Sequence, residues 1–495
     1  MITPTTSYLS LLHKIFNKFF YLIITIYFLT QSVSDYALLI LYFLLSSYMY
    51  EIYSLSIPKA FSIFYYKFKR DVYLSTISFT AYLTLFLFIC SCILFYFIKN
   101  FFDVNSEFSN YFFLLAVCIG GLSIALDDII DKFCFLELKH NNLYFFDFFK
   151  LTIILIFVIF YFYFFTNLNI FNFLIIYSSL IILFSLFKYF IFLGKLNLNI
   201  LINLNNLKKI EFKGIPIIMF SIFLTSILIL TQLTFSRILI VNFKGLDFFA
   251  NFSFHYQLVE ISSLFFLAII QIIVPVIIHS VKKGHEKKII IFQEKILIIY
   301  LLFPPIIFLV INFIAKNLIL LFTSQIIYDP ILMFFLSLNL FSFSLFMTFY
   351  QYLLIKKKEI FFIKTLLVGL ILNLILSIIL IKYFSLTGVA IANFLSNYVI
   401  FIILNKKLNF FYFRKKTYKY LLFYSTRLIL IFFVLFLFPI PDFYPSTFMN
   451  LMKDLIYCSI LIFISEIFMP RQYRILKNYN DFMQLVKFNL KKRNF

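Results

Sequence analysis

Apolar runs long enough to cross a bilayer recur from one end of this sequence to the other, and they limit the possible folds more than any other feature. A helix rising 1.5 Å per residue needs about 20 apolar residues to cross the hydrocarbon core of a membrane. In this chain 63% of the residues are hydrophobic and only 13% are charged. The runs are continuous rather than alternating, which excludes a β-barrel. The sequence therefore predicts an all-α polytopic membrane protein.

The runs predict about 14 transmembrane helices. The expected spans are residues 17–33, 36–57, 72–98, 109–126, 147–165, 169–193, 215–241, 247–279, 290–315, 331–354, 360–381, 386–405, 420–439 and 450–469. A polar connector at 194–213 separates the first six from the other eight. We expect an N-terminal lobe at 1–193, a C-terminal lobe at 214–408, and an extra helix pair with a cytoplasmic tail at 409–495. Six spans, six spans and an added pair indicate two related six-helix lobes.

The distribution of Lys and Arg predicts the orientation of these spans. If the N-terminus is placed inside, only six of the 43 basic residues fall on outer segments or outer span ends: Lys99, Arg237, Lys244, Lys316, Lys382 and Lys453. Cytoplasmic segments of membrane proteins are enriched in basic residues. Both termini are therefore expected in the cytoplasm. The outer segments are all short, so we expect no external domain.

Polar side chains recur at helical spacing in the two runs that meet at the short loop 242–247. The two sets are Ser221, Thr225, Gln232 and Ser236 in the first run, and Ser253, Gln257, Glu260 and Gln271 in the second. These spacings return side chains to nearly the same side of a helix. Polar stripes inside apolar helices are typical of a cavity that holds water or a substrate. Gln232, Gln257 and Gln271 are expected either to line that path or to bond neighbouring helices together.

Two charged residues of these runs are the main candidates for binding. Arg237 either meets an anionic group in the cavity or extends to the outer headgroups of the bilayer. Glu260 lies deeper in its span, where a carboxylate needs a partner or water. Lys188 and Lys364 sit near cytoplasmic span ends, as does Arg427. Each is interpreted as a membrane anchor on its own, and the three together as a cationic vestibule for a substrate.

Other polar residues favour a structural role. Glu51, Asp127 and Asp128 lie near span ends and are interpreted as helix-interface residues. Two pairs at a spacing of four residues are expected to join helices, namely Asn373 with Ser377 and Asn393 with Asn397.

The sequence offers no sign of an enzyme or a cofactor site. It contains no phosphate-binding loop, zinc-protease motif or nucleophile elbow. Its five cysteines show no metal-ligand spacing and are interpreted as small buried residues. The net charge of +22 is spread over short loops, which does not indicate nucleic-acid binding. We therefore expect no catalytic residue, no metal and no cofactor.

Three stretches resemble the multidrug/oligosaccharidyl-lipid/polysaccharide exporter superfamily, and in particular its Wzx-type polysaccharide and O-antigen flippases. They are SRILIVNFKGLDFFANFSFHYQLVE at 236–260, SLTGVAIANFLSNYVIFIILNKK at 385–407, and SVSDYALLILYFLLS at 32–46. Arg237 matches the basic residue of the family's seventh span. The acidic residue that often precedes it is Ser236 here.

This resemblance implies two six-helix lobes around a central cavity. It implies alternating-access transfer of a polyprenyl-diphosphate-linked oligosaccharide across the bacterial cytoplasmic membrane, with the extra helix pair forming a groove for the lipid tail. A polysaccharide polymerase and a chain-length regulator are the expected protein partners. The alternatives are a drug or ion antiporter of the same superfamily, in which Glu260 is the coupling site, an O-antigen polymerase, and a structural membrane subunit.

Overall fold

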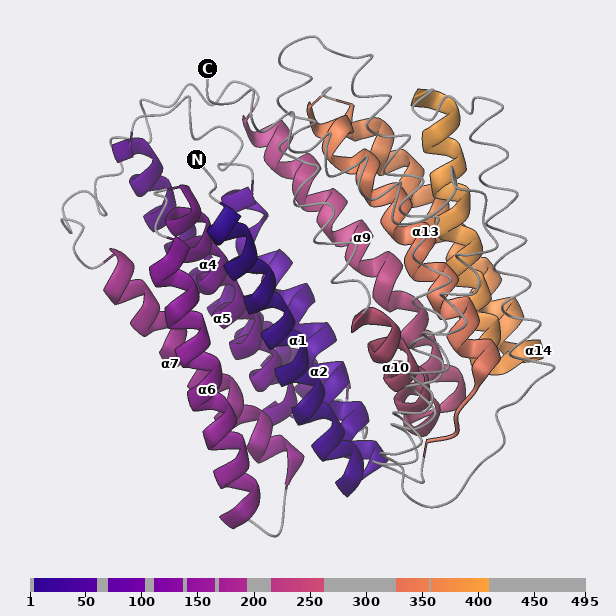
Figure 1. Cartoon of the computed structure of the whole chain (residues 1–495), viewed down its shortest axis with the longest axis horizontal. Helices are drawn as coiled ribbons and strands as arrows, with labels where there is room; N and C mark the ends of the chain where they lie inside the picture. Colours follow the sequence, from indigo (N-terminus) through magenta and orange to yellow (C-terminus); the bar gives the residue numbers. More distant parts are fainter. Residues whose placement is uncertain are drawn as a thin grey trace. The chain divides into compact units, whose positions relative to one another are not determined.

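The computed structural model describes residues 4–59, 70–102, 111–136, 140–164, 169–193, 215–261, 326–355 and 358–408. Every main element in these ranges is an α-helix (Figure 1). The helices are α1 (Pro4–Gln31), α2 (Val33–Ser54), α4 (Arg70–Phe102), α5 (Tyr111–Leu136), α6 (His140–Phe164), α7 (Ile170–Leu193), α9 (Ile215–Lys244), α10 (Leu246–Ile261), α13 (Pro330–Ile355) and α14 (Glu359–Leu408).

The all-helical architecture predicted from the apolar runs is confirmed for these ranges. Six helices within the described residues are long and apolar enough to cross a membrane: Val33–Ser54, Tyr111–Asp131, Leu143–Tyr161, Ile170–Phe192, Met219–Lys244 and Glu359–Lys407. The predicted spans 290–315, 420–439 and 450–469 lie outside the described residues. So does the second half of the predicted span 247–279. The total of about 14 spans therefore stays a prediction.

The chain divides into two compact units, Met1–Thr234 and Phe235–Phe495, and the boundary falls inside α9. The predicted lobes at 1–193 and 214–408 and the connector between them remain a prediction.

The first unit is built around α5, which packs against α7, α2 and α4. Two glycines allow the close approach of α2 to α5. A Cβ atom on Gly121 would lie 2.3 Å from the Cβ of Met49, and one on Gly120 would lie 2.5 Å from the hydroxyl oxygen of Tyr42. Since non-bonded carbon atoms need about 3.5 Å or more, a Cβ at Gly121 would push against α2, and a Cβ at Gly120 would displace the Tyr42 side chain.

Replacing Gly121 with alanine is expected to destabilise the first unit. Overpacking of this kind costs about 1–3 kcal/mol, against a gain of about 1 kcal/mol in helix propensity. Thermal unfolding of the purified protein in detergent should show a lower midpoint for Gly121→Ala. Ile124→Val, on an exposed position of the same helix, should leave the midpoint unchanged. A higher midpoint for Gly121→Ala would contradict the tight α2–α5 contact.

In the second unit, α13 packs along α14, and α10 packs against α13. α14 is interrupted at Ser385, whose φ of 50° and ψ of −131° are not helical. This break separates two segments that match the predicted spans 360–381 and 386–405. Asp329 stabilises the start of α13, because its Oδ1 accepts hydrogen bonds from the backbone N–H groups of Ile331 and Leu332 at 2.9 and 3.0 Å.

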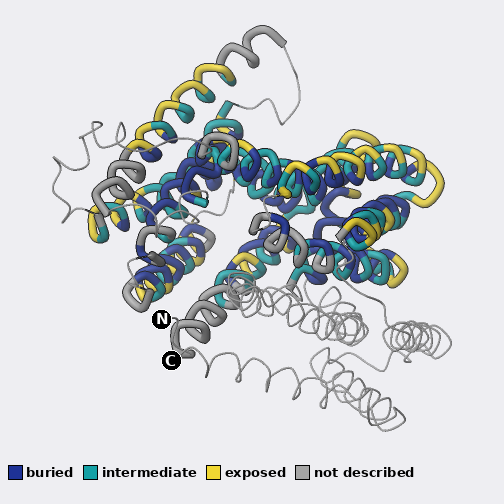
Figure 2. The backbone as a smooth tube through the Cα atoms, turned by 90° about the horizontal axis from the view of Figure 1, so that it is seen from above, coloured by how far each residue is buried: buried dark blue, intermediate teal, exposed yellow. Residues whose placement is uncertain are grey.

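Large apolar side chains cover the outer faces of the helices. Examples are Phe145, Ile156 and Tyr163 on α6 and Leu183 and Phe190 on α7, all more than half exposed. The buried stretches lie where helices face one another, drawn dark blue in Figure 2. Exposed apolar faces of this extent are what a helix surface in contact with lipid requires.

Candidate functional site

Arg237 is held inside the second unit by an aromatic ring. Its side chain belongs to α9, only 6% of the residue is exposed, and its Cζ lies 3.6 Å from the centroid of the Tyr256 ring on α10. Gly245, with a φ of 93°, ends α9 and lets α10 begin at once, which brings Tyr256 back beside Arg237. A guanidinium group at this distance over a ring face is stabilised by a cation–π interaction.

The guanidinium group of Arg237 is not neutralised by any carboxylate that the structure describes. Its Nε atom is buried and has no hydrogen-bond partner, and none of its contacts in the described part of the chain is an ion pair. Glu260 lies one turn beyond Tyr256 on α10 and is close enough to act electrostatically on the Tyr256 phenol. A buried cation without an anionic partner carries a large desolvation cost. The arrangement therefore leaves the Nε edge of Arg237 able to receive an anion.

Polar groups beside Arg237 join three helices of the second unit. Asn393 on α14 donates a hydrogen bond from Nδ2 to Ser236 Oγ on α9, at 2.9 Å. One turn along α14, Asn397 Nδ2 donates to Asn339 Oδ1 on α13, at 2.6 Å. The predicted helix-joining pair Asn393 and Asn397 thus forms bonds between helices.

Two further buried atoms near this junction have no hydrogen-bond partner in the described structure. They are Asn393 Oδ1 and Ser253 Oγ, and Ser253 lies one turn before Tyr256 on α10. Buried polar atoms are nearly always hydrogen-bonded, so each open acceptor or hydroxyl group indicates a place for a polar group of a ligand or for water. Arg237, Ser253, Tyr256 and Asn393 together are called the Arg237 site.

The other predicted binding residues of this part of the chain differ in where they lie relative to the Arg237 site. Gln232 is buried on α9, one turn before Ser236, while Gln257 and Glu260 are half-buried on α10. Gln271 lies outside the described residues. Lys364 is exposed near the start of α14, so within the second unit it is not among the buried groups of the Arg237 site.

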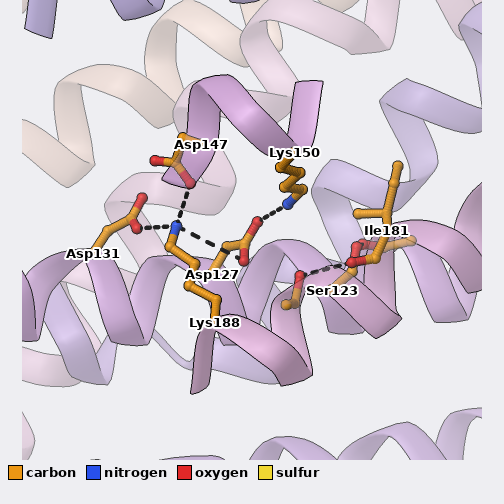
Figure 3. A network of polar contacts seen from close by, with 9 residues as sticks. Ser123, Asp127, Asp131, Asp147, Lys150, Ile181 and Lys188 are labelled. Carbon is orange, nitrogen blue, oxygen red and sulfur yellow. Dashed lines mark hydrogen bonds and ion pairs between the residues drawn. The ribbon is translucent and has the colours of Figure 1, made fainter. Parts of the chain in front are cut away.

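Lys188 lies in the first unit, within a cluster of charged side chains (Figure 3). The residue is 1% exposed, and its Nζ atom lies 2.5 Å from Asp131 Oδ1 and 2.7 Å from Asp147 Oδ1. Asp127 approaches to 4.0 Å and also pairs with Lys150. These five residues, the Lys188 cluster, come from α5, α6 and α7. Because carboxylates surround the Lys188 ammonium group, the geometry favours a structural role for it over substrate binding.

Sequence reasoning missed most of the Lys188 cluster. Asp127 was expected at a helix interface, but Asp131, Asp147 and Lys150 were not singled out. A usable signal was present, since Asp127 and Asp131 are four residues apart at one span end and Asp147 and Lys150 are three apart at the start of another. In the described residues no group of three or more His, Cys, Asp or Glu side chains is arranged to hold a metal ion.

Comparison of the sequence with protein-family models and with characterised protein sequences finds no match. Solved structures do match. An outward-facing multidrug resistance MATE family transporter of the MOP superfamily aligns with a TM-score of 0.58 at 12% identity, over 86% of this chain and 95% of its own. A MOP superfamily transporter from Pyrococcus furiosus gives 0.57 at 13% identity, over 81% and 94%. The lipid II flippase MurJ, in an inward closed conformation, gives 0.54 at 16% identity, over 94% and 99%. The chain therefore has the fold of these transporters.

Proposed function

We propose that this protein is a flippase that moves a polyprenyl-diphosphate-linked oligosaccharide across the bacterial cytoplasmic membrane. The observation that carries the proposal is the buried Arg237, which has no carboxylate partner among the described residues. A guanidinium edge binds two oxygens of a phosphate group at once, and the low-dielectric surroundings strengthen that contact. The anionic diphosphate then supplies the negative charge that no described carboxylate supplies.

The remaining groups of the Arg237 site support a substrate that also carries hydroxyl groups. Asn393 Oδ1 can accept a hydrogen bond, and Ser253 Oγ can donate or accept one. A sugar head group presents many such partners, and its lipid tail can stay in the bilayer. The same fold occurs in a lipid II flippase, whose substrate is also a lipid. No bond needs to be broken, since the two predicted lobes can expose the site alternately to each side.

A drug or ion antiporter is the second candidate, and Glu260 is the observation that favours it. Its half-buried carboxylate on α10 is a group that a cation or proton can neutralise. The same fold occurs in a multidrug transporter. Glu260→Gln then distinguishes the two functions. If the protein is an antiporter, cells with this variant should become more sensitive to the drug. If it is a flippase, their drug resistance should not change.

Deletion of the gene tests the proposed function. Cells without the protein should accumulate the complete repeat unit on its carrier lipid at the cytoplasmic face and should lack surface polymer, and a plasmid copy should restore the polymer. The proposed partners, a polymerase and a chain-length regulator, act on the exported unit. Single units already exposed on the outer face would indicate a polymerase. Normal carrier lipids with increased drug sensitivity would indicate an antiporter.

The proposed placement in the membrane makes a separate prediction about topology. Reporter fusions at Asp247, Asp329 and Asp442 should be active outside the cytoplasm, and fusions at Lys283, Lys357 and Lys416 should be active inside it. The reason is the concentration of Lys and Arg in the predicted inner segments. An inverted signal at any one of these six positions would show that the predicted spans are wrong there.

A further inference from the structure

α2 ends in a strained turn. Leu55 and Ser56 have φ values of 45° and 52°, in the left-handed region that glycine adopts easily and other residues avoid. The backbone N–H of Leu55 still closes the last turn of α2 onto the carbonyl oxygen of Glu51, at 3.1 Å. Helical structure then resumes at Ile57. Strained backbone of this kind persists only where the surrounding contacts require it, and it is frequent at functional sites.

The strained turn returns Lys59 to the side chain of Glu51. The Nζ atom of Lys59 lies 2.5 Å from Glu51 Oε1, and Ser56 Oγ donates a hydrogen bond to Glu51 Oε2 at 3.2 Å. Lys59 Nζ also lies 5.2 Å from the centroid of the Tyr50 ring. Glu51 is only 8% exposed, and each of its two carboxylate oxygens has a partner inside the protein. The turn therefore serves to place the ammonium group of Lys59.

Lys59 and Tyr48 both reach α9, by contacts that lie inside the first unit. Lys59 Nζ donates a hydrogen bond to Ser226 Oγ at 3.2 Å. The hydroxyl of Tyr48 lies 2.5 Å from Thr234 Oγ1. Thr234 donates its own hydrogen to the Leu230 carbonyl, so Tyr48 is the donor. The two contacts lie at different points along α9. The later residue, Lys59, pairs with the earlier residue of α9, Ser226, as expected for antiparallel helices.

This connection differs from the other contacts of α2. Along its length α2 packs extensively on α5, and also on α1, α4 and α7, whereas its packing against α9 is slight. The side chain of Lys59 is 30% exposed and lies just past the predicted cytoplasmic end of the second span, where water can replace its partners. Interlocked apolar packing resists separation, whereas hydrogen bonds that water can replace have a small net free energy and can open and close again.

We propose that Tyr48, Glu51, Lys59, Ser226 and Thr234 form a latch that holds α2 against α9 in one state of the transport cycle and opens in the other. The inference rests on the proposed transport function, because α2 belongs to the predicted N-terminal lobe and α9 begins the predicted C-terminal lobe. Alternating access requires such lobes to separate on one side. The turn at Leu55 and Ser56 keeps Lys59 directed at Glu51, so the latch can form again.

Distances between spin labels test the latch without any substrate. In a variant whose native cysteines are replaced, labels go on Ile52→Cys of α2 and Phe220→Cys of α9, two positions on exposed parts of these helices. Reconstituted in lipid, this pair should give two distances. Lys59→Met should raise the longer-distance population at least three-fold. Ser226→Ala, which removes one hydrogen bond and leaves the ion pair, should raise it less.

The matched control is a label pair between another two helices that are in contact within the first unit. Ile52→Cys with Leu186→Cys joins α2 to α7, and it should give one distance that Lys59→Met does not change. A single α2–α9 distance, unaffected by Lys59→Met and by Ser226→Ala, would overturn the latch. The distance measurement needs no substrate, so it can disprove the latch even if the deletion strain accumulates the lipid-linked unit. The deletion test can likewise fail while the two distances persist.

Discussion

Replacing Arg237 with glutamine is expected to abolish surface polysaccharide while leaving the amount of protein in the membrane unchanged. Arg237 has no carboxylate partner among the described residues, so its removal strands no opposite charge among them. Loss of a buried contact between a cation and an anionic ligand costs about 2 kcal/mol or more, hence about 30-fold or more in binding. Export should be measured as surface polymer per cell, and protein amount by immunoblot of membranes.

Two further variants make the Arg237 result specific. Arg237→Lys keeps the charge but cannot bind a phosphate through two parallel donors, so partial export is expected. Lys364→Gln removes an exposed cation of the same unit and should export normally. If Arg237→Gln exports as the wild type does, the anion is not bound at Arg237.

Replacing Lys188 with methionine should have the largest effect on stability. The change removes the cation that lies between Asp131 and Asp147, two carboxylates within 2.7 Å of its ammonium group. Breaking a buried ion pair by removing one partner costs about 3–5 kcal/mol, because the other charge stays buried and unpaired. Thermal unfolding in detergent should show a much lower midpoint. The difference from wild type should shrink at low pH, where protons neutralise the stranded carboxylates.

A compensating variant separates charge from packing. Adding Asp131→Asn and Asp147→Asn to Lys188→Met removes both stranded charges and should recover part of the lost stability. Lys364→Met, which removes an exposed lysine, should unfold as the wild type does. An unchanged midpoint for Lys188→Met would contradict the Lys188 cluster.

The helical fold was predictable because its signal is local. A run of apolar residues shows its span without knowledge of its neighbours. The break in α14 at Ser385 was likewise placed between two predicted spans, since polar and small residues interrupt the apolar pattern there. The three-helix Lys188 cluster was not predictable, because pairing Lys188 with Asp131 and Asp147 requires knowing that α5, α6 and α7 meet. Near span ends, such charges look like ordinary loop residues.

The residues of the candidate site were also only partly predictable from the sequence. Arg237 was identified because a charge inside an apolar run is costly and therefore informative. Tyr256, whose ring covers the guanidinium group of Arg237, was not identified. It is one of 34 tyrosines and has no distinguishing neighbour in the sequence. Lys59 lies just past the predicted end of the second span. The strained turn that directs it consists of Leu55 and Ser56, residues that do not predict a left-handed conformation.

The most direct measurement of anionic lipid transport is the movement of a labelled lipid between the two leaflets of liposomes that contain the purified protein. The probe is a short polyprenyl diphosphate carrying a fluorescent sugar, and its uncharged counterpart lacks the diphosphate. The wild type should move the diphosphate probe between leaflets, Arg237→Gln should not, and the uncharged probe should not be moved by either protein. Equal transfer of both probes by the wild type, or transfer of the diphosphate probe by Arg237→Gln at the wild-type rate, would contradict the proposed role of Arg237 and the anionic substrate.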